Sequence, residues 1–253
     1  MAVATVAILS VVVNESNHVR VSVIMPTHNE AQAIGRVLAD VPSDLVTEVL
    51  IVDSDSSDGT PDIARKMGAR VIQEPRRGYG RACLTGLANA NTPDIVVFLD
   101  GDYSDRPSEL PILLAPIMDG HADITLGSRL GTKRVPGALP WHQVLGNRLA
   151  ASLIRFLYGL KITDLGPFRA GRADVLRALA LEETTYGWAV EMILKGALAG
   201  FRIVEVPVSY YPRIGKSKIG GTLKGTAGAA WFILSLIVRY YFRHRRTGTR
   251  RPT

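Results

Sequence analysis

Three carboxylates fall within ten residues directly after an apolar run, in the segment FLDGDYSDRP at 98–107. Two of them, Asp100 and Asp102, are separated by one glycine. Carboxylates held this close where water is partly excluded raise each other's pKa unless a cation lies between them. Mg²⁺ and Mn²⁺ bind one or two carboxylates and complete their coordination with substrate phosphates. The pattern predicts a Mn²⁺ or Mg²⁺ site at Asp100 and Asp102, with a solvated turn as the alternative.

A second set of residues has the chemistry of an anion site. The run PRIGKSK supplies Arg213, Lys216 and Lys218, and the run GSR adds Arg129. Guanidinium and ammonium groups bind phosphate through charge-assisted hydrogen bonds. We expect these four residues to bind an acceptor phosphate, with a solvated basic loop as the alternative.

Two glycine-containing segments come close to known nucleotide motifs without matching them. In RRGYGRAC, Cys83 stands where the dinucleotide fingerprint has its third glycine. Before GKS, Tyr210 stands where a P-loop has its leading glycine. Both departures disfavour a dehydrogenase or a kinase. The glycines and arginines around Gly80 nevertheless lie where a strand gives way to a helix, and helix-start amides can bind phosphate.

The elements that must position these residues alternate regularly from residue 20 onward. β-Branched apolar runs predict strands, and the segments between them have helical spacing. This alternation predicts an α/β fold with a mostly parallel sheet covered on both faces. The predicted strands are 20–26, 47–55, 69–75, 94–102, 122–129 and 201–211, and the predicted helices are 30–41, 60–68, 80–91, 107–120, 141–158 and 184–200.

Acidic residues follow two of these strands. Asp53 and Asp55 close the second strand, and Asp100 and Asp102 close the fourth. Ligands of parallel α/β sheets bind beyond the carboxyl ends of the strands. We therefore expect these acids to meet at one rim of the sheet, around a bound ligand.

The composition fits one large domain. With 253 residues, 47% of them hydrophobic, the chain can bury a sizeable core. The single cysteine, Cys83, excludes an intrachain disulfide and fits a reducing compartment, and we expect it to be a buried core residue. We divide the chain into an apolar extension at 1–19, a catalytic domain at 20–222 and an apolar helix with a basic tail at 223–253.

Positive charge is concentrated in that tail. From Arg239 onward the tail has six arginines and no acid, against a formal net charge of +7 for the whole chain. In the sequence before the tail, aromatic and basic residues do not alternate in the way that is typical of a nucleic-acid-binding groove. We therefore expect no nucleic-acid partner. The fourteen uncharged residues before the tail are too few to span a bilayer. We expect an interfacial helix with Trp231, Tyr240 and Tyr241 at headgroup depth, and a buried C-terminal helix is the alternative.

The order of motifs along residues 20–220 resembles that of family 2 glycosyltransferases, which are inverting enzymes with the GT-A fold. Further motifs, TDLGPFRA and EVPVSYYPRIGKSKIGG, resemble the branch that makes polyprenyl-phosphate sugars, such as dolichyl-phosphate mannose or glucose synthases. The motifs that carry the family resemblance are MPTHNE at 25–30, VDSDSSDGT at 52–60, RRGYGRAC at 76–83, DGDYSD at 100–105 and GSR at 127–129.

The resemblance implies roles for individual residues. It makes Asp100 and Asp102 the diphosphate and metal site, with Asp102 and Arg129 taking part in catalysis. Many relatives have two adjacent acids where this chain has Asp53, Ser54 and Asp55, so the base contact departs from the common pattern. The residues expected to bind a UDP- or GDP-hexose are Pro26, Glu30, Asp53, Asp55, Gly80, Asp100 and Gly101.

One departure from the family bears on the acceptor. Relatives that glycosylate a hydroxyl carry an Asp on the helix before LAGYRI-like sequence, and the matching position here is Ala189. A sugar hydroxyl must lose its proton as it attacks, whereas a phosphate monoester is already ionised at pH 7. The missing base favours a lipid phosphate acceptor, although Glu191 lies close enough in sequence to act as the base.

These observations predict an inverting, metal-dependent hexosyltransferase that uses a polyprenyl phosphate at the cytoplasmic face of the cell membrane. One alternative is a glycosyltransferase acting on a glycan or small-molecule hydroxyl. A nucleotidyltransferase would ordinarily have a glycine-rich basic signature where this chain has PTHNE. A non-catalytic, membrane-associated binder of sugar nucleotides is the remaining alternative.

Overall fold

A computed structural model of the chain describes residues 19–130, 135–215 and 223–247. Lys216 and Lys218, which we expected to bind phosphate, lie outside the described residues, as do nearly all of the apolar extension and the end of the basic tail.

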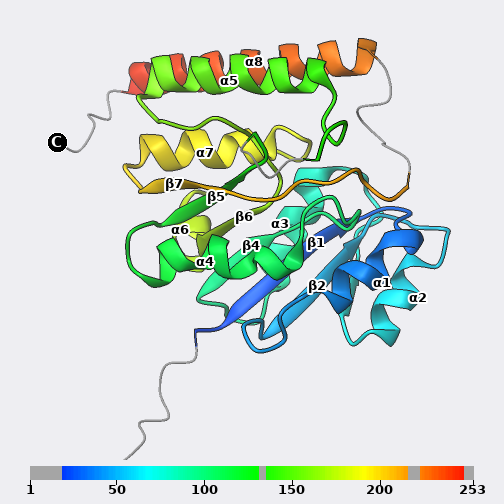
Figure 1. The fold of residues 1–253 in the computed structure, drawn as a ribbon. Helices are drawn as coiled ribbons and strands as arrows, with labels where there is room; N and C mark the ends of the chain where they lie inside the picture. Colours follow the sequence, from blue (N-terminus) through cyan, green and yellow to red (C-terminus); the bar gives the residue numbers. More distant parts are fainter. Residues whose placement is uncertain (1–18, 131–134, 216–222, 248–253) are drawn as a thin grey trace, which may run out of the picture.

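The described residues form one sheet of seven strands in the order β3-β2-β1-β4-β6-β5-β7 (Figure 1). Neighbouring strands run parallel except at β6, which runs antiparallel to both β4 and β5. The prediction of a mostly parallel sheet is confirmed. The strands are β1 (Val21–Thr27), β2 (Glu48–Asp53), β3 (Arg70–Gln73), β4 (Ile95–Phe98), β5 (Ile124–Ser128), β6 (Arg169–Arg172) and β7 (Ile203–Pro207).

Helices cover both faces of the sheet because its strands alternate apolar residues toward two separate cores. Val23 and Met25 of β1 point to the core under α1, α2 and α4, while Ile24 points to the core under α3, α6 and α7. Cys83 is buried in the second of these cores, as predicted. The helices are α1 (Ala31–Ala39), α2 (Thr60–Lys66), α3 (Tyr79–Asn89), the 3₁₀ helix η1 (Pro107–Glu109), α4 (Leu110–Met118), α5 (Trp141–Tyr158), α6 (Ala173–Ala178), α7 (Trp188–Leu198) and α8 (Leu223–Thr247).

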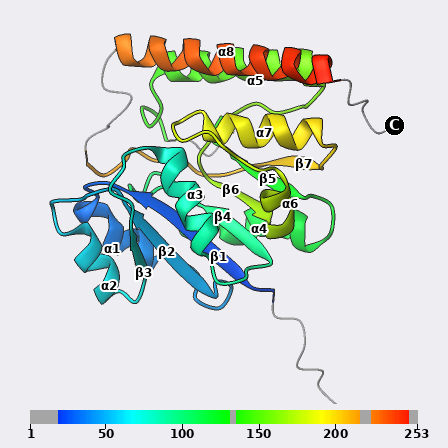
Figure 2. The same cartoon turned by 180° about the vertical axis from the view of Figure 1, so that it is seen from behind.

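Two long helices, α5 and α8, form an additional outer layer. They lie side by side over α7, on the side away from the sheet (Figures 1 and 2). Leu236 and Ile237 of α8 are buried, and the hydroxyl of Tyr158 donates a 2.7 Å hydrogen bond to the carbonyl of Ile237. α8 is therefore packed on the domain along one side.

The other side of α8 differs in part from our expectation. Trp231 is 76% exposed, as an interfacial residue would be. Tyr240 and Tyr241 instead turn inward, because Tyr240 donates a hydrogen bond to Glu191 and Tyr241 packs edge-on against Tyr158. Among the described residues, no helix has the length and apolar character needed to cross a membrane.

Candidate active site

The paired acids lie in a tight turn directly after β4. Gly101 separates them because a Cβ there would come within 2.9 Å of Thr27 Cγ2 at the end of β1. Asp102 is 4% exposed and accepts a 2.9 Å hydrogen bond from the backbone N–H of Ser104. Ser104 Oγ donates a second hydrogen bond to the same oxygen, at 2.6 Å. The turn thus holds both carboxylates at the rim where β1 and β4 end.

Positive charge from the segment after β7 reaches the same rim. Arg213 Nη2 lies 3.2 Å from Asp102 and 3.3 Å from Glu30, so its guanidinium bridges two acids from different strand ends. Burial raises the pKa of Asp100, and the negative charge of Asp102 raises it further, while Arg213 and Arg129 oppose both effects. The two arginines do not fully offset this cluster of acids, since the pKa of Asp100 stays raised, so the site favours further positive charge.

The two carboxylates fit a divalent ion of the magnesium or manganese type. Such ions need only one or two protein carboxylates when water and phosphate oxygens supply the other ligands. Within the described ranges, no group of three or more His, Cys, Asp or Glu side chains is placed to hold a metal by itself. An ion at Asp100 and Asp102 would therefore depend on oxygens that arrive with a substrate.

A hollow of about 630 Å³, lined mainly by charged and polar residues, opens beside these acids. Most of the residues expected to bind the nucleotide sugar line it, together with the second expected metal ligand and one predicted phosphate ligand. Those residues are Pro26, Glu30, Asp100, Gly101, Asp102 and Arg213.

Asp53 and Asp55 belong to the neighbouring turn and are not part of the hollow's lining. Asp53 is 1% exposed and accepts hydrogen bonds from Thr27 Oγ1 and the backbone N–H of Ser56. Asp55 is exposed, with a left-handed φ of 59°. Asp53 pairs with Thr27 in the β1–β2 register, so it lies at the same rim as Gly101, where it shapes the turn.

Gly80 has a different role from the nucleotide contact that we expected. A Cβ at this position would lie 2.3 Å from the carbonyl oxygen of Glu183 and 2.6 Å from Trp188 Cβ. Its backbone N–H donates to the carbonyl of Thr185, and that of Arg81 donates to Thr184. The second and third amides of α3 therefore donate to the loop before α7, and Gly80 does not line the hollow.

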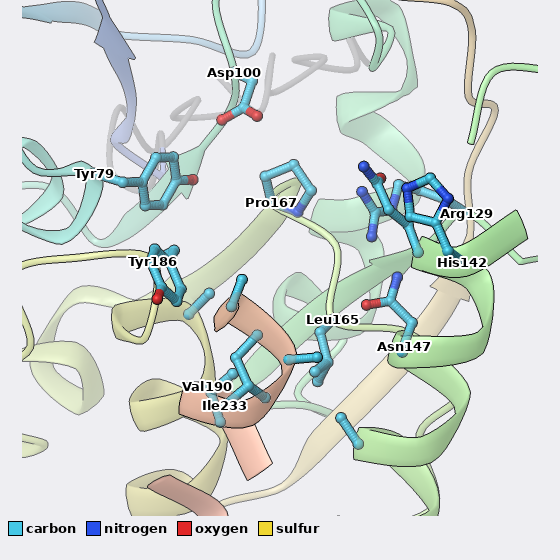
Figure 3. Close-up of a pocket in the computed structure, with 16 residues that line it drawn as sticks. Tyr79, Asp100, Arg129, His142, Asn147, Leu165, Pro167, Tyr186, Val190 and Ile233 are labelled. Atoms are coloured by element: carbon cyan, nitrogen blue, oxygen red, sulfur yellow. The ribbon is translucent and has the colours of Figure 1, made fainter. Parts of the chain in front are cut away.

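A second hollow, of about 310 Å³, adjoins the first and extends under α5 and α8 (Figure 3). Tyr79, Asp100 and Tyr186 line both hollows. The rest of the second lining is mainly apolar, with polar groups gathered at one side. It consists of Arg129, His142, Gln143, Gly146, Asn147, Ala150, Leu165, Pro167, Ala189, Val190, Ala229, Ala230 and Ile233.

Arg129 is fixed at this hollow by Asp164, from the segment that precedes β6. Its Nε and Nη2 donate to the two carboxylate oxygens at 2.8 and 2.9 Å, and its backbone N–H donates to the same group. Asn147 adds a 2.7 Å hydrogen bond to Asp164. Burial alone would raise the pKa of Asp164, but the charge and hydrogen bonds of Arg129 outweigh it and keep that pKa below its ordinary value. The pair therefore stays ionised in a buried position.

Glu191, which we considered as a substitute base, lies outside both hollows. Its carboxylate is fully buried and accepts hydrogen bonds from the backbone of Glu182 and Glu183 and from Tyr240. It also pairs with Lys195 at 2.8 Å. These contacts tie α7 to α8 and to the preceding loop, so the structure gives Glu191 a structural role. Ala189, at the position of the missing base, does line the second hollow.

Three residues of the site were not assigned a substrate or support role from the sequence. Tyr79 lies between the hollows, and burial, followed by the charge of Asp100, raises the pKa of its hydroxyl. Asp164 lies within the TDLGPFRA motif, which contributed to the family resemblance but did not indicate a role for this residue. His142 belongs to no motif of the sequence, and it lies at the start of α5 and lines the second hollow.

The segment after β7 packs over the turn that carries Asp100 and Asp102. The guanidinium of Arg106 stacks between the rings of Tyr103 and Tyr211, at 3.9 and 3.8 Å from their centroids. The backbone N–H groups of Tyr211 and Ile214 donate to the carbonyls of Ser104 and Asp102. This packing brings Arg213 to the acids from far along the chain.

A mostly parallel sheet with one reversed strand and paired acids at its carboxyl rim defines the GT-A class of glycosyltransferase. The chain belongs to glycosyl transferase family 2, whose family model matches residues 22–180. The predicted family and fold are thereby confirmed, and the chain is a glycosyltransferase.

Relatives and solved structures agree with this assignment. A dolichyl-phosphate hexose transferase of Haloferax volcanii is 39% identical over 81% of this chain and 89% of its own length. An undecaprenyl-phosphate mannosyltransferase of Micrococcus luteus is 36% identical over 82% of this chain and 90% of its own. Glucosyl-3-phosphoglycerate synthase of Mycobacterium tuberculosis, solved with Mn²⁺, UDP-glucose and phosphoglyceric acid, has a TM-score of 0.71 at 22% identity, covering 88% of this chain and 79% of that one.

Proposed function

We propose that the protein transfers a hexose, glucose or mannose, from a UDP- or GDP-sugar to a polyprenyl phosphate, with inversion at the anomeric carbon. The observation that carries this proposal is the pair of adjoining hollows, which share Tyr79, Asp100 and Tyr186. Most residues that line the first are charged or polar, and most that line the second are apolar. A hydrophilic donor and a lipid acceptor need two such compartments that meet at the reacting atoms.

The polar hollow suits the donor. Pro26 and Glu30 line its nucleotide end, and Arg213 brings a guanidinium to the diphosphate position. When bound, Mn²⁺ or Mg²⁺ at Asp100 and Asp102 would supply positive charge that offsets the leaving diphosphate. Arg213 and Arg129 add fixed positive charge around the same position, which stabilises developing negative charge.

The largely apolar hollow suits the acceptor. Its polar side carries Arg129, which can meet a phosphate, and small or apolar side chains of α5, α7 and α8 line the remainder. Ala189 supplies no base there, and an ionised phosphate oxygen needs none. The similarity to lipid-phosphate glycosyltransferases supports the same acceptor class.

The reaction then consists of one displacement. A phosphate oxygen of the acceptor attacks the anomeric carbon and forms the new C–O bond. The bond from that carbon to the donor diphosphate breaks on the opposite side, and the electron pair leaves with the nucleoside diphosphate. The residues of this chain orient the two substrates and stabilise the separated charge.

We further propose that the protein acts at the cytoplasmic face of the membrane as a peripheral protein. The outer sides of α5 and α8 each carry exposed apolar residues at helical spacing, with exposed Arg148, Arg155 and Arg239 beside them. Apolar side chains flanked by arginines suit an anionic lipid surface. The exposed apolar residues are Trp141, Leu145, Leu149 and Phe156 on α5 and Trp231, Val238 and Phe242 on α8.

An acceptor panel tests the proposed reaction. Purified protein would receive labelled UDP- or GDP-hexose and Mn²⁺ with undecaprenyl phosphate, undecaprenol or a soluble glycan. Of the three acceptors, we expect only the lipid phosphate to give product. That product should release free sugar in mild acid, because a glycosyl phosphate bond is acid-labile. Transfer to undecaprenol or to the glycan, without transfer to the lipid phosphate, would favour the hydroxyl-directed alternative.

A further inference from the structure

We propose that His142 binds the acceptor phosphate in the second hollow and makes the site select a phosphate over a hydroxyl. The inference rests on the proposed function because it concerns the acceptor compartment of the same site. It starts from a side chain at the polar side of that hollow to which the proposed reaction gives no task.

The charge balance of the hollow favours a second cationic donor, because its lining holds the carboxylate of Asp100 as well as Arg129. The charge of Arg129 is already matched by Asp164, which takes up both Nε and Nη2 and leaves Nη1 to meet a ligand. A phosphate monoester at neutral pH carries nearly two negative charges. Among the described residues that line the hollow, His142 is the other side chain able to carry positive charge.

The position of His142 also favours an anion. It is the second residue of α5, a helix of 18 residues whose positive end therefore lies at this wall. Amides of a helix's first turn commonly bind phosphate, although that of Gln143 already donates to the carbonyl of Pro140 at 3.0 Å. The hollow is lined by one side of α5 from His142 to Ala150, so a phosphate beside the first turn would lie next to His142 and near the positive end of the helix.

One ring nitrogen of the His142 imidazole lacks a hydrogen-bond partner. Its Nε2 is buried and has no hydrogen-bond partner among the residues described. Leaving such a group without a partner is costly, so a bound ligand would stabilise it. The ring of Trp141 packs edge-on against the imidazole at 5.8 Å, and Figure 3 shows His142 on the same wall as Arg129 and Asn147, opposite Tyr79.

Binding of short probes tests this inference without requiring turnover. The full-length protein would be titrated calorimetrically with geranyl phosphate and with geraniol. We expect the wild type to prefer the phosphate by at least about tenfold, as a hydrogen bond to a charged group implies. His142→Ala should lose most of that preference while its affinity for geraniol is unchanged, and His142→Gln, which keeps an N–H donor, should recover part of it.

His121→Ala is the matched control, because His121 is exposed in the turn before β5. It should bind both probes as the wild type does, and thermal unfolding should show that all variants are folded. Equal affinity of the wild type and His142→Ala for geranyl phosphate would overturn the inference, as would a wild type that does not distinguish the two probes.

Turnover gives a second readout that a merely structural histidine would not produce. With undecaprenyl phosphate as acceptor, His142→Ala should raise the acceptor KM about tenfold and leave the donor KM and kcat nearly unchanged. A fall in kcat at an unchanged acceptor KM would instead identify a general base and overturn the inference. The wild type could make no lipid product while its binding of geranyl phosphate still requires His142. That result would contradict the proposed function and leave the inference about His142 intact.

Discussion

The guanidinium of Arg129 lines the second hollow because a carboxylate 35 residues further along the chain holds it there. Asp164 is 1% exposed, and its carboxylate oxygens accept hydrogen bonds from Arg129, Asn147 and the backbone N–H of Leu165. Buried ion pairs add little net stability, but losing one partner is costly because the other charge is left unmatched. Asp164 is therefore a positioning residue whose loss should be visible in stability.

We predict that Asp164→Asn lowers the free energy of unfolding by about 3 kcal/mol at pH 7. The folded-state pKa of Asp164 lies below its ordinary value, so its ionisation stabilises the fold above the unfolded pKa of about 4, and this stability is lost as the pH falls through the folded-state pKa. Urea unfolding at pH 7, 5 and 3 should show the difference between wild type and variant shrinking toward pH 3.

The control is Asp62→Asn, since Asp62 is 71% exposed in a surface pair with Arg65 and should change stability by less than about 0.5 kcal/mol. A deficit for Asp164→Asn that stays constant from pH 7 to pH 3 would contradict the assignment of a buried ionised pair.

Individual residues differed in how far the sequence could place them. Asp100 and Asp102 could be placed because they directly follow a buried apolar strand, and strand ends meet at one rim. Asp53 reached the predicted rim, but its contacts depend on Ser56 and Thr27, which no pattern links to it. The partnership of Arg129 with Asp164 depends on where β5 and β6 lie in the sheet, so spacing alone does not reveal it.

At the scale of elements, α3 approaches the loop before α7 unusually closely at Gly80. We predict that Gly80→Ala destabilises the fold by about 1–3 kcal/mol, because the new methyl would lie 2.3 Å from the carbonyl oxygen of Glu183. It should also lower transfer, since the same loop carries Thr185 and Tyr186 into the hollows. Thermal unfolding and turnover would measure both effects.

Gly35→Ala, within α1, is the comparison. The nearest atom to a methyl at Gly35 is Cγ2 of Ile63 in α2, at an ordinary contact distance of 3.8 Å. Replacing a helical glycine by alanine normally stabilises by about 0.5–1 kcal/mol. If the two substitutions had the same effect on stability, the close approach at Gly80 would be disproved.

The outer layer of α5 and α8 gives a second prediction at this scale. Replacing Phe156 and Trp231, which are 84% and 76% exposed, by serine should leave the fold intact. Co-sedimentation with phosphatidylglycerol vesicles should weaken at least about tenfold, because two large side chains no longer enter the lipid. Met118→Ser, on α4 with 52% exposure, should bind vesicles like the wild type. If the double variant and Met118→Ser lost vesicle binding equally, the outer side of α5 and α8 would not be the membrane-binding surface.

The elements were predictable where apolar periodicity ran long enough. The helix at 141–158 matches α5, and each predicted strand is present, shifted by one residue in β1 and with shorter ends in the others. β6 was missed because only four residues form it, and their burial comes from neighbours on both sides. The inward turn of Tyr240 was missed because it depends on a buried Glu191 on another helix.

At the scale of the whole molecule, the sheet rim holds the acids, and α5 and α8 form a layer beyond α7 (Figure 1). The two hollows adjoin between the rim and these helices, and Figure 3 shows the second of them. The sequence could predict the rim and the donor side from strand order. The second hollow could not be foreseen, because it forms only where α5, α7 and α8 come together.

The central claim is that Asp100 and Asp102 hold a divalent ion that neutralises the donor diphosphate. A thermal-shift panel of UDP- and GDP-hexoses with and without Mn²⁺, on the wild type and Asp102→Asn, tests it most directly. At about 100 times Kd, a bound donor should raise the wild-type Tm by roughly 5–10 °C with Mn²⁺ and by much less without it, and Asp102→Asn should lose the Mn²⁺-dependent part. An equal shift without the cation, or in Asp102→Asn, would contradict the claim.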